Sequence, residues 1–168
     1  MLKSFALKGV ALAAVMSATI SALAEDVSVK AVMVPKESIR MEAGDGSKHF
    51  VLMVRREGNA EGSGMLAGAA VTEYGWHDID PPHGGDPHGY LQFKAGNGDI
   101  ANIKWIVRAV FFKGEEKPIL ADYGHWELVS GTGQFKGMTG VGTLTIKPAS
   151  KTDRLFTLDG ELGPKVGS

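Results

Sequence analysis

Apolar and polar side chains alternate along much of this chain, which is the pattern of β-strands that bury one face. The longest regular run extends from Ile100 to Phe112. One set of alternate positions in this run is wholly apolar, and we expect it to face the core: Ile103, Trp105, Val107, Ala109 and Phe111.

The same alternation predicts further strands, separated by turns rich in glycine, proline, asparagine and aspartate. They are Val27 to Val34, ended by Pro35 and continued briefly by Ser38 to Met41; His49 to Arg55; Met65 to Trp76; Tyr90 to Lys94; Ile119 to Val129; the run that ends at Ile146; and Arg154 to Leu162. Small residues leave Met65 to Trp76 open to a helix as well, but its β-branched and aromatic residues favour a strand.

A glycine-rich stretch, WELVSGTGQFKGMTGVGTLTI, runs from Trp126 to Ile146. Its glycines interrupt apolar strand residues at short intervals, at positions that tolerate positive φ or a close approach of the backbone. A phosphate-binding loop is the alternative, but such loops lead into a helix, whereas this stretch continues into the alternating sequence GTLTIKP. The stretch therefore predicts bent β-structure.

Seven or eight strands joined by short turns predict an all-β protein, either a sandwich or a barrel. We favour an antiparallel eight-stranded closed barrel, because closure removes exposed sheet edges and glycines within strands allow a sheet to bend sharply. A β-sandwich is the alternative.

The glycine-rich stretch also resembles a known signature. Gly131-Thr132-Gly133, followed by Phe135, Gly137 and the Gly140–Gly142 pair, is similar to the GTGxFxGxxGxGT motif of the allene oxide cyclase and dirigent barrel superfamily. The resemblance implies an eight-stranded barrel that holds a small, largely apolar molecule and, in characterised relatives, steers cyclisation or radical coupling. The active-site residues of that superfamily have no residue-by-residue match here.

The first 24 residues have the features of a cleaved secretory signal peptide. Lys3 and Lys8 precede or flank a short apolar run, and Ala22-Leu23-Ala24 is a small-x-small cleavage site. Cleavage would leave residues 25–168 as a single barrel domain with no membrane anchor, located in a periplasm or secreted. The chain has no cysteine, so neither disulfides nor thiolate metal sites are available.

The charge pattern narrows the range of partners. The formal net charge is −1, and both signs are dispersed along the chain. This argues against nucleic acid and against an anionic membrane surface as partners. A small apolar ligand is the partner that the resemblance implies, and apolar residues on both faces of several strands leave room for a homo-oligomer.

A polar segment from His77 to His88, HDIDPPHGGDPH, is predicted to be a loop. Its imidazoles and carboxylates could bind zinc, copper or nickel, with His77, Asp80, His83 and His88 as candidate ligands. The spacing matches no compact metal motif, so a solvated loop at the rim of the barrel is the other interpretation. No organic cofactor is predicted.

Two groups of candidate ligand-contacting or catalytic residues lie on strands. Tyr123, His125 and Glu127 share one face of their strand and would act together if that face lined the interior; otherwise they face solvent. Trp105 is expected to line the interior, and Lys104 and Arg108, on the opposite face, could bind an anionic ligand or be ordinary surface charges.

Three hypotheses of function follow. The first is an exported small barrel that binds an apolar or aromatic molecule in its interior. The second is a cyclase or isomerase that acts on such a ligand by controlling its conformation. The third is a periplasmic metal-binding protein that uses the His77–His88 segment. Ser130 lies in VSGTG, which lacks the G-x-S-x-G pattern of a serine nucleophile, so a serine hydrolase is not predicted.

Overall fold

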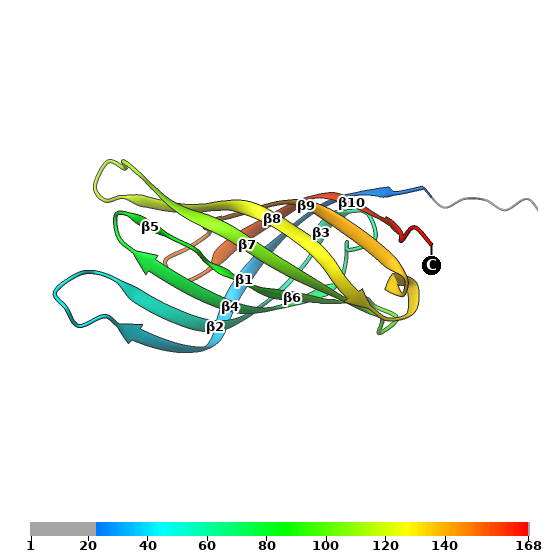
Figure 1. Ribbon diagram of the computed structural model, residues 1–168, viewed down its shortest axis with the longest axis horizontal. Helices are drawn as coiled ribbons and strands as arrows, with labels where there is room; N and C mark the ends of the chain where they lie inside the picture. Colours follow the sequence, from blue (N-terminus) through cyan, green and yellow to red (C-terminus); the bar gives the residue numbers. More distant parts are fainter. Residues whose placement is uncertain (1–22, 168) are drawn as a thin grey trace, which may run out of the picture.

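The computed structural model describes residues 23–167, and this part of the chain is built almost entirely of β-strands (Figure 1). Ten strands form a single antiparallel sheet. They are β1 (Glu25–Glu42), β2 (Phe50–Asn59), β3 (Glu61–Ser63), β4 (Ala70–Asp80), β5 (Gly84–Gly85), β6 (His88–Lys94), β7 (Ile100–Phe112), β8 (Ile119–Gly131), β9 (Met138–Pro148) and β10 (Arg154–Pro164), with one 3-10 turn, η1 (Gly133–Phe135). The predicted signal peptide falls almost wholly outside the described residues.

The strand pairings form a ring. The first part of β1 pairs with β10 and the second part pairs with β2. The ring then runs through β4, β6, β7, β8 and β9 back to β10, while β3 and β5 are short additions. The prediction of an all-β antiparallel protein is confirmed, and the arrangement is barrel-like. Between residues 23 and 167 no helix is long and apolar enough to cross a membrane.

The structure corrects three details of the predicted strands. Pro35 does not end the first strand, because β1 passes it through a bulge between Pro35 and Glu37, where a missing N–H is tolerated. Residues 65–68 form a turn, and the strand begins only at Ala70. The segment from His77 to His88 is not all loop, because β4 continues to Asp80, with residues up to Ile79 paired to β2 and Asp80 paired to Gly84 of β5.

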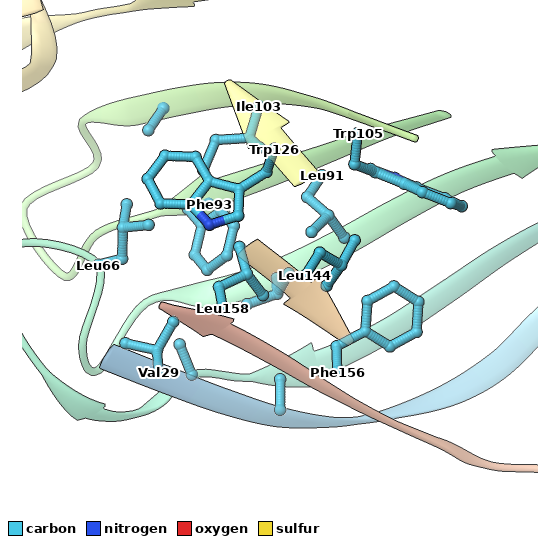
Figure 2. Packing of buried hydrophobic residues seen from close by; sticks show 14 of the residues in the cluster. Val29, Leu66, Leu91, Phe93, Ile103, Trp105, Trp126, Leu144, Phe156 and Leu158 are labelled. Carbon is cyan, nitrogen blue, oxygen red and sulfur yellow. The ribbon is translucent and has the colours of Figure 1, made fainter. Parts of the chain in front are cut away.

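The interior of the ring is packed with apolar side chains over the half nearest the N-terminus of β1 (Figure 2). Leu66, from the turn before β4, and Phe135, from η1, are fully buried and close this end. Trp105 and Phe156 lie at the opposite side of the cluster and meet edge to face, with ring centroids 6.2 Å apart. The core thus fills one end of the ring and stops at Trp105.

The glycine-rich stretch makes room for Trp126. This indole is fully buried, and a Cβ added at Gly142 would lie 2.6 Å from its Cε2 and Nε1 atoms. A Cβ at Gly160 on β10 would lie 2.7 Å from Cζ2 of the same ring. The indole therefore rests directly on the backbones of β9 and β10, and these glycines serve close packing.

Replacing Gly142 with alanine should destabilise the protein. The added methyl group overlaps the indole and the backbone of Asp159, and overpacking of this kind costs about 1–3 kcal/mol. Urea denaturation would measure the change in the free energy of unfolding. Gly96→Ala is the matched control, since nothing lies within 4 Å of its Cβ position, and its change should stay within about 0.5 kcal/mol. Equal effects of the two substitutions would contradict the packing role of Gly142.

Candidate functional site

A layer of charged side chains lies inside the ring, next to the apolar core. Arg56, Glu73, His77 and Asp122 are all at least nine-tenths buried. We call these four residues, with the half-buried Arg154, the charged layer. Buried charges are costly unless they are paired, so such a layer is uncommon in a protein interior.

Three members of the charged layer contact one another. The Nη1 group of Arg56 donates a hydrogen bond of 2.7 Å to Oε2 of Glu73, and this pair is directly opposite across β2 and β4. Nε2 of His77 lies 3.1 Å from Oε1 of Glu73 and 3.2 Å from Nη1 of Arg56. Glu73 is thereby supplied with donors on both carboxylate oxygens when His77 carries its proton on Nε2.

Gly75 makes the contact between Glu73 and His77 possible. These residues are four positions apart on the same face of β4, with Gly75 between them. A Cβ at Gly75 would lie 2.5 Å from Oε1 of Glu73 and 2.7 Å from Nε2 of His77. The two side chains therefore meet over a position where only glycine leaves space.

Asp122 is the member without a partner. Its Oδ1 atom is buried and has no hydrogen bond, although the charges of Arg154 and Arg56 are close enough to act on it. Burial raises the pKa of Asp122 to about 7, and the nearby arginines offset only part of this effect. The carboxyl can therefore give up or take a proton near neutral pH. Burial also lowers the pKa of Arg154 from its usual value.

Next to the charged layer lie the indole of Trp105 and a group of apolar side chains at the open end of the ring. The ring of Trp105 lies 5.8 Å from that of His77, and its Nε1 has no hydrogen-bond partner among the described residues. Nε of Arg56 is likewise unpartnered. Beyond the layer, the inward-facing positions of β2, β4, β7 and β8 are apolar and several are only half-buried; we call them the mouth: Phe50, Leu52, Ile79, Ala109, Phe111 and Leu120. On β1, the guanidinium of Arg40 lies 3.6 Å from the centre of the Phe50 ring. This geometry suits a small molecule with an apolar body and a few polar substituents.

Tyr123, His125 and Glu127 lie on the outer wall of the ring, so they do not line the interior. The reason is that Trp126 is buried inside the ring against the backbone of Gly142, so alternation turns the opposite face of β8 outward. The sequence leaves open whether these three residues line the interior or face solvent, and in the structure they face solvent.

The three residues predicted to bind a ligand lie on opposite sides of the wall of the ring. Trp105 faces the interior, as expected. Lys104 and Arg108 face outward: Nζ of Lys104 lies 3.9 Å from Oε1 of Glu127, and Arg108 contacts the carboxylate of Asp86. They cannot reach a ligand held beside Trp105, because the wall of the ring lies between.

The four predicted metal ligands are not brought together. His77 points into the interior, while Nδ1 of His83 contacts Oδ2 of Asp80 at 3.0 Å. His88 lies on the outer wall with its Nδ1 group 3.0 Å from the carbonyl oxygen of Asp86. Within residues 23–167 no group of three or more histidine, cysteine or acidic residues is placed to hold a metal ion.

Sequence analysis missed Arg56, Glu73, Asp122 and Arg154. A usable signal was present, since Arg56 follows Phe50, Leu52 and Val54 on one strand face, and Asp122 shares the face of Trp126 and Leu128. A charged residue in phase with buried apolar residues predicts either a buried pair or a site.

Solved structures show the same fold. The sequence matches no protein-family model and no curated protein. The structure is similar to the pterocarpan synthase dirigent protein GePTS1, with a TM-score of 0.50, 12% identity and coverage of 95% of this chain and 99% of that chain. For the pterocarpan synthase dirigent protein PsPTS1 the TM-score is 0.52, the identity 9% and the coverage 86% and 97%. For a conserved protein of unknown function from Rhodopseudomonas palustris, the TM-score is 0.52 and the identity 10%, with coverage of 85% of this chain and 99% of that chain. These likenesses confirm the predicted resemblance to dirigent proteins as a likeness of fold.

Stability should depend on pH through Asp122. Its pKa is about 7 in the folded protein and 3.8 as the ordinary value, so between these values the folded state holds a proton that the unfolded state lacks. Raising the pH from about 4 to 7 therefore lowers the free energy of unfolding, by up to about 1.4 kcal/mol per pH unit. Urea denaturation over this range should show Asp122→Asn gaining stability relative to the wild type as the pH rises. Parallel curves for the two proteins would contradict the assignment.

Removing the carboxylate of Glu73 should be strongly destabilising. Glu73→Ala leaves Arg56 buried without its ion partner, a change that typically costs about 3–5 kcal/mol. The exposed pair of Glu37 with Arg55 provides the control, and Glu37→Ala should cost far less than Glu73→Ala, because water screens exposed ion pairs. The comparison uses urea denaturation at one pH. A small effect at both positions would mean that the interior pair is not needed for folding.

Proposed function

We propose that this protein is an exported closed barrel that binds a small, largely apolar or aromatic molecule in its interior, at the end formed by the mouth and the charged layer. The observation that carries the proposal is the carboxyl of Asp122, which is buried and unpartnered next to two arginines. Native proteins rarely leave buried polar groups unsatisfied, and a ligand with a hydroxyl or carbonyl group would supply the missing hydrogen bond.

The surrounding side chains support a ligand of this kind. Nε1 of Trp105 and Nε of Arg56 are further unpartnered donors near the same level of the ring. The half-buried Leu52 and Leu120 of the mouth offer apolar surface to the body of the molecule. A hydrophobic lining with a few polar groups is the usual composition of small-molecule sites. The export and the resulting periplasmic or secreted location rest on the amino-terminal sequence alone.

A second candidate function is a cyclase or isomerase that works on the bound molecule. The observation that favours it is the pKa of Asp122, since a group that titrates near neutral pH is suited to general acid or base catalysis. Two proteins of the same fold are named pterocarpan synthase dirigent proteins, which is consistent with chemistry in such an interior. In this version Asp122 replaces the outward-facing Tyr123, His125 and Glu127 as the residue to test.

The protein purified from its own source should carry an organic adduct in native mass spectrometry. Binding can also be followed with 2-naphthol, an uncharged aromatic alcohol, through the fluorescence of the tryptophans. Asp122→Asn should weaken the affinity by about tenfold, since hydrogen bonds to charged groups are worth about 1.5–3 kcal/mol. Leu120→Trp, which fills the mouth, should abolish binding.

Asp159→Asn is the control, because Asp159 is an exposed residue of β10 that bonds Ser28. Equal affinity in all these proteins would refute binding at the charged layer.

The enzyme hypothesis needs a further experiment. The molecule released from the protein would be incubated with wild type and with Asp122→Asn, and a new chromatographic species formed only by the wild type would support it.

A further inference from the structure

Arg154 is a cation of the charged layer that has no anionic partner. Its side chain is half-buried, and its Nη1 group donates a hydrogen bond of 2.9 Å to the backbone carbonyl oxygen of Asp153. Between residues 23 and 167 it forms no ion pair. Burial and the charge of Arg56 lower its pKa, and the carboxyl groups of Asp122, Asp153 and Glu73 offset only part of this effect. A desolvated cation in this setting favours an anion beside it.

The acidic residues of the charged layer do not supply that anion. Glu73 is engaged by Arg56 at 2.7 Å and by His77 at 3.1 Å. Asp122 is buried, its Oδ1 atom has no hydrogen bond in the described part of the chain, and burial raises its pKa to about 7. Below that pH Asp122 is mostly protonated, so the two guanidinium groups of the layer face a single carboxylate. The charged layer therefore lacks one negative charge.

Strand register gathers these groups around one part of the interior. Asp122 lies on β8, Arg154 on β10 and Arg56 on β2. Arg154 is paired with Met33 of β1, and Arg56 is paired with Pro35, two positions further along the same strand. The charges of both arginines act on Asp122, and Nε of Arg56 is an unpartnered donor. An anionic group among these side chains would meet two guanidinium groups and one carboxyl group.

Aromatic rings lie on either side of the charged layer. In the mouth, Phe50 and Phe111 are half-buried, and the guanidinium of Arg40 lies 3.6 Å from the centre of the Phe50 ring. On the side of the core, Trp105 meets Phe156 edge to face, and Nε1 of Trp105 is a further donor without a partner among the described residues (Figure 2). Flat rings around a polar layer suit a ligand with a flat aromatic body.

We infer that the ligand of the interior site is an aromatic carboxylate, with its anionic group between Arg154 and Arg56 and its ring in the mouth. The inference rests on the proposed function, because it names the class of molecule that the interior binds. Guanidinium groups donate charge-assisted hydrogen bonds to a planar carboxylate, and protonated Asp122 donates its hydrogen to the same group. A hydroxyl group could accept such hydrogen bonds but would supply no negative charge.

Two ligands of almost the same shape test the need for charge. Isothermal titration calorimetry at a pH of about 6 would compare 2-naphthoate with the neutral 2-naphthamide. The wild-type protein should bind 2-naphthoate at least about tenfold more tightly, as expected for hydrogen bonds between charged groups. Equal affinities, with 2-naphthol still bound, would overturn this inference and leave the proposed function standing. Failure of all three molecules to bind would refute the interior as a binding site for such ligands.

Arg154→Gln tests where the anionic group binds. The affinity for 2-naphthoate should fall by about tenfold, while that for 2-naphthamide should stay within about twofold. Stability in urea should change little, because no ion pair is lost. Arg108→Gln is the matched control, since Arg108 is an arginine of the outer wall that contacts Asp86, and it should leave both affinities unchanged. Undiminished binding of 2-naphthoate by Arg154→Gln would overturn the inference.

The proton on Asp122 provides a third test. Above a pH of about 7 Asp122 ionises and repels a bound carboxylate, so the affinity for 2-naphthoate should fall by up to about tenfold per pH unit. Arg154, Arg56 and Glu73 also act on Asp122, and His77 contacts Glu73, but all four remain in Asp122→Asn. This variant should still bind, because an amide also donates to a carboxylate, and its affinity should not fall. Parallel pH profiles for the two proteins would overturn the contact between Asp122 and the anion.

Discussion

The contact between Trp126 and the backbones of β9 and β10 determines which side of the sheet is the inside. An indole can lie directly against the backbones of two strands only where both lack a side chain, and Gly142 and Gly160 provide that space. With Trp126 inside, alternation assigns every other residue of β8 to the interior or to the outer wall. Asp122 is placed inside and His125 outside by the same contact. Strand register then determines which residues of the neighbouring strands face the interior.

Along its length, the interior of the ring has an apolar, closely packed half and a half that contains charged side chains. One half is a core closed by Leu66 and Phe135, and it supplies the apolar burial that stabilises the fold. The other half begins at Trp105 and places several charges at low exposure. Burying charges opposes folding, so this half lowers the stability that the core provides. Under the proposed function, this layer provides specificity for a ligand at the expense of stability.

The inner and outer surfaces of the wall carry different chemistry. Inside, Arg56 and Glu73 are paired in a setting from which water is largely removed, where electrostatic interactions are strong. Outside, Arg55 and Glu37 are paired in a solvated setting where such contacts contribute little on their own. Arg55 and Arg56 are adjacent in sequence, and the strand directs them to opposite sides. One wall therefore presents buried, paired charges on its inner surface and solvated charges on its outer surface.

The sequence by itself determined the strands, their antiparallel connection and much of the core. Ile100 to Phe112 is predicted with the same limits that the structure has, and its buried face contains Trp105 as expected. These features depend on local alternation and on turn residues, which can be read within a few positions. The Gly131–Gly142 motif added the resemblance to barrels of this fold, because its spacing reflects how residues pack at that corner of the fold.

Only the tertiary structure decided which charged residues meet. Arg56, Glu73 and Asp122 come from three strands, and their positions in one layer depend on register and on which face turns inward. Period two leaves both faces of β8 equally open as the interior until Trp126 is placed against Gly142. The candidate metal ligands His77 and His88 were separated for the same reason, because strand pairing sends one into the ring and the other to its outer wall. Alternation is a property of each strand alone, whereas the inside of a ring exists only once all of its strands are joined.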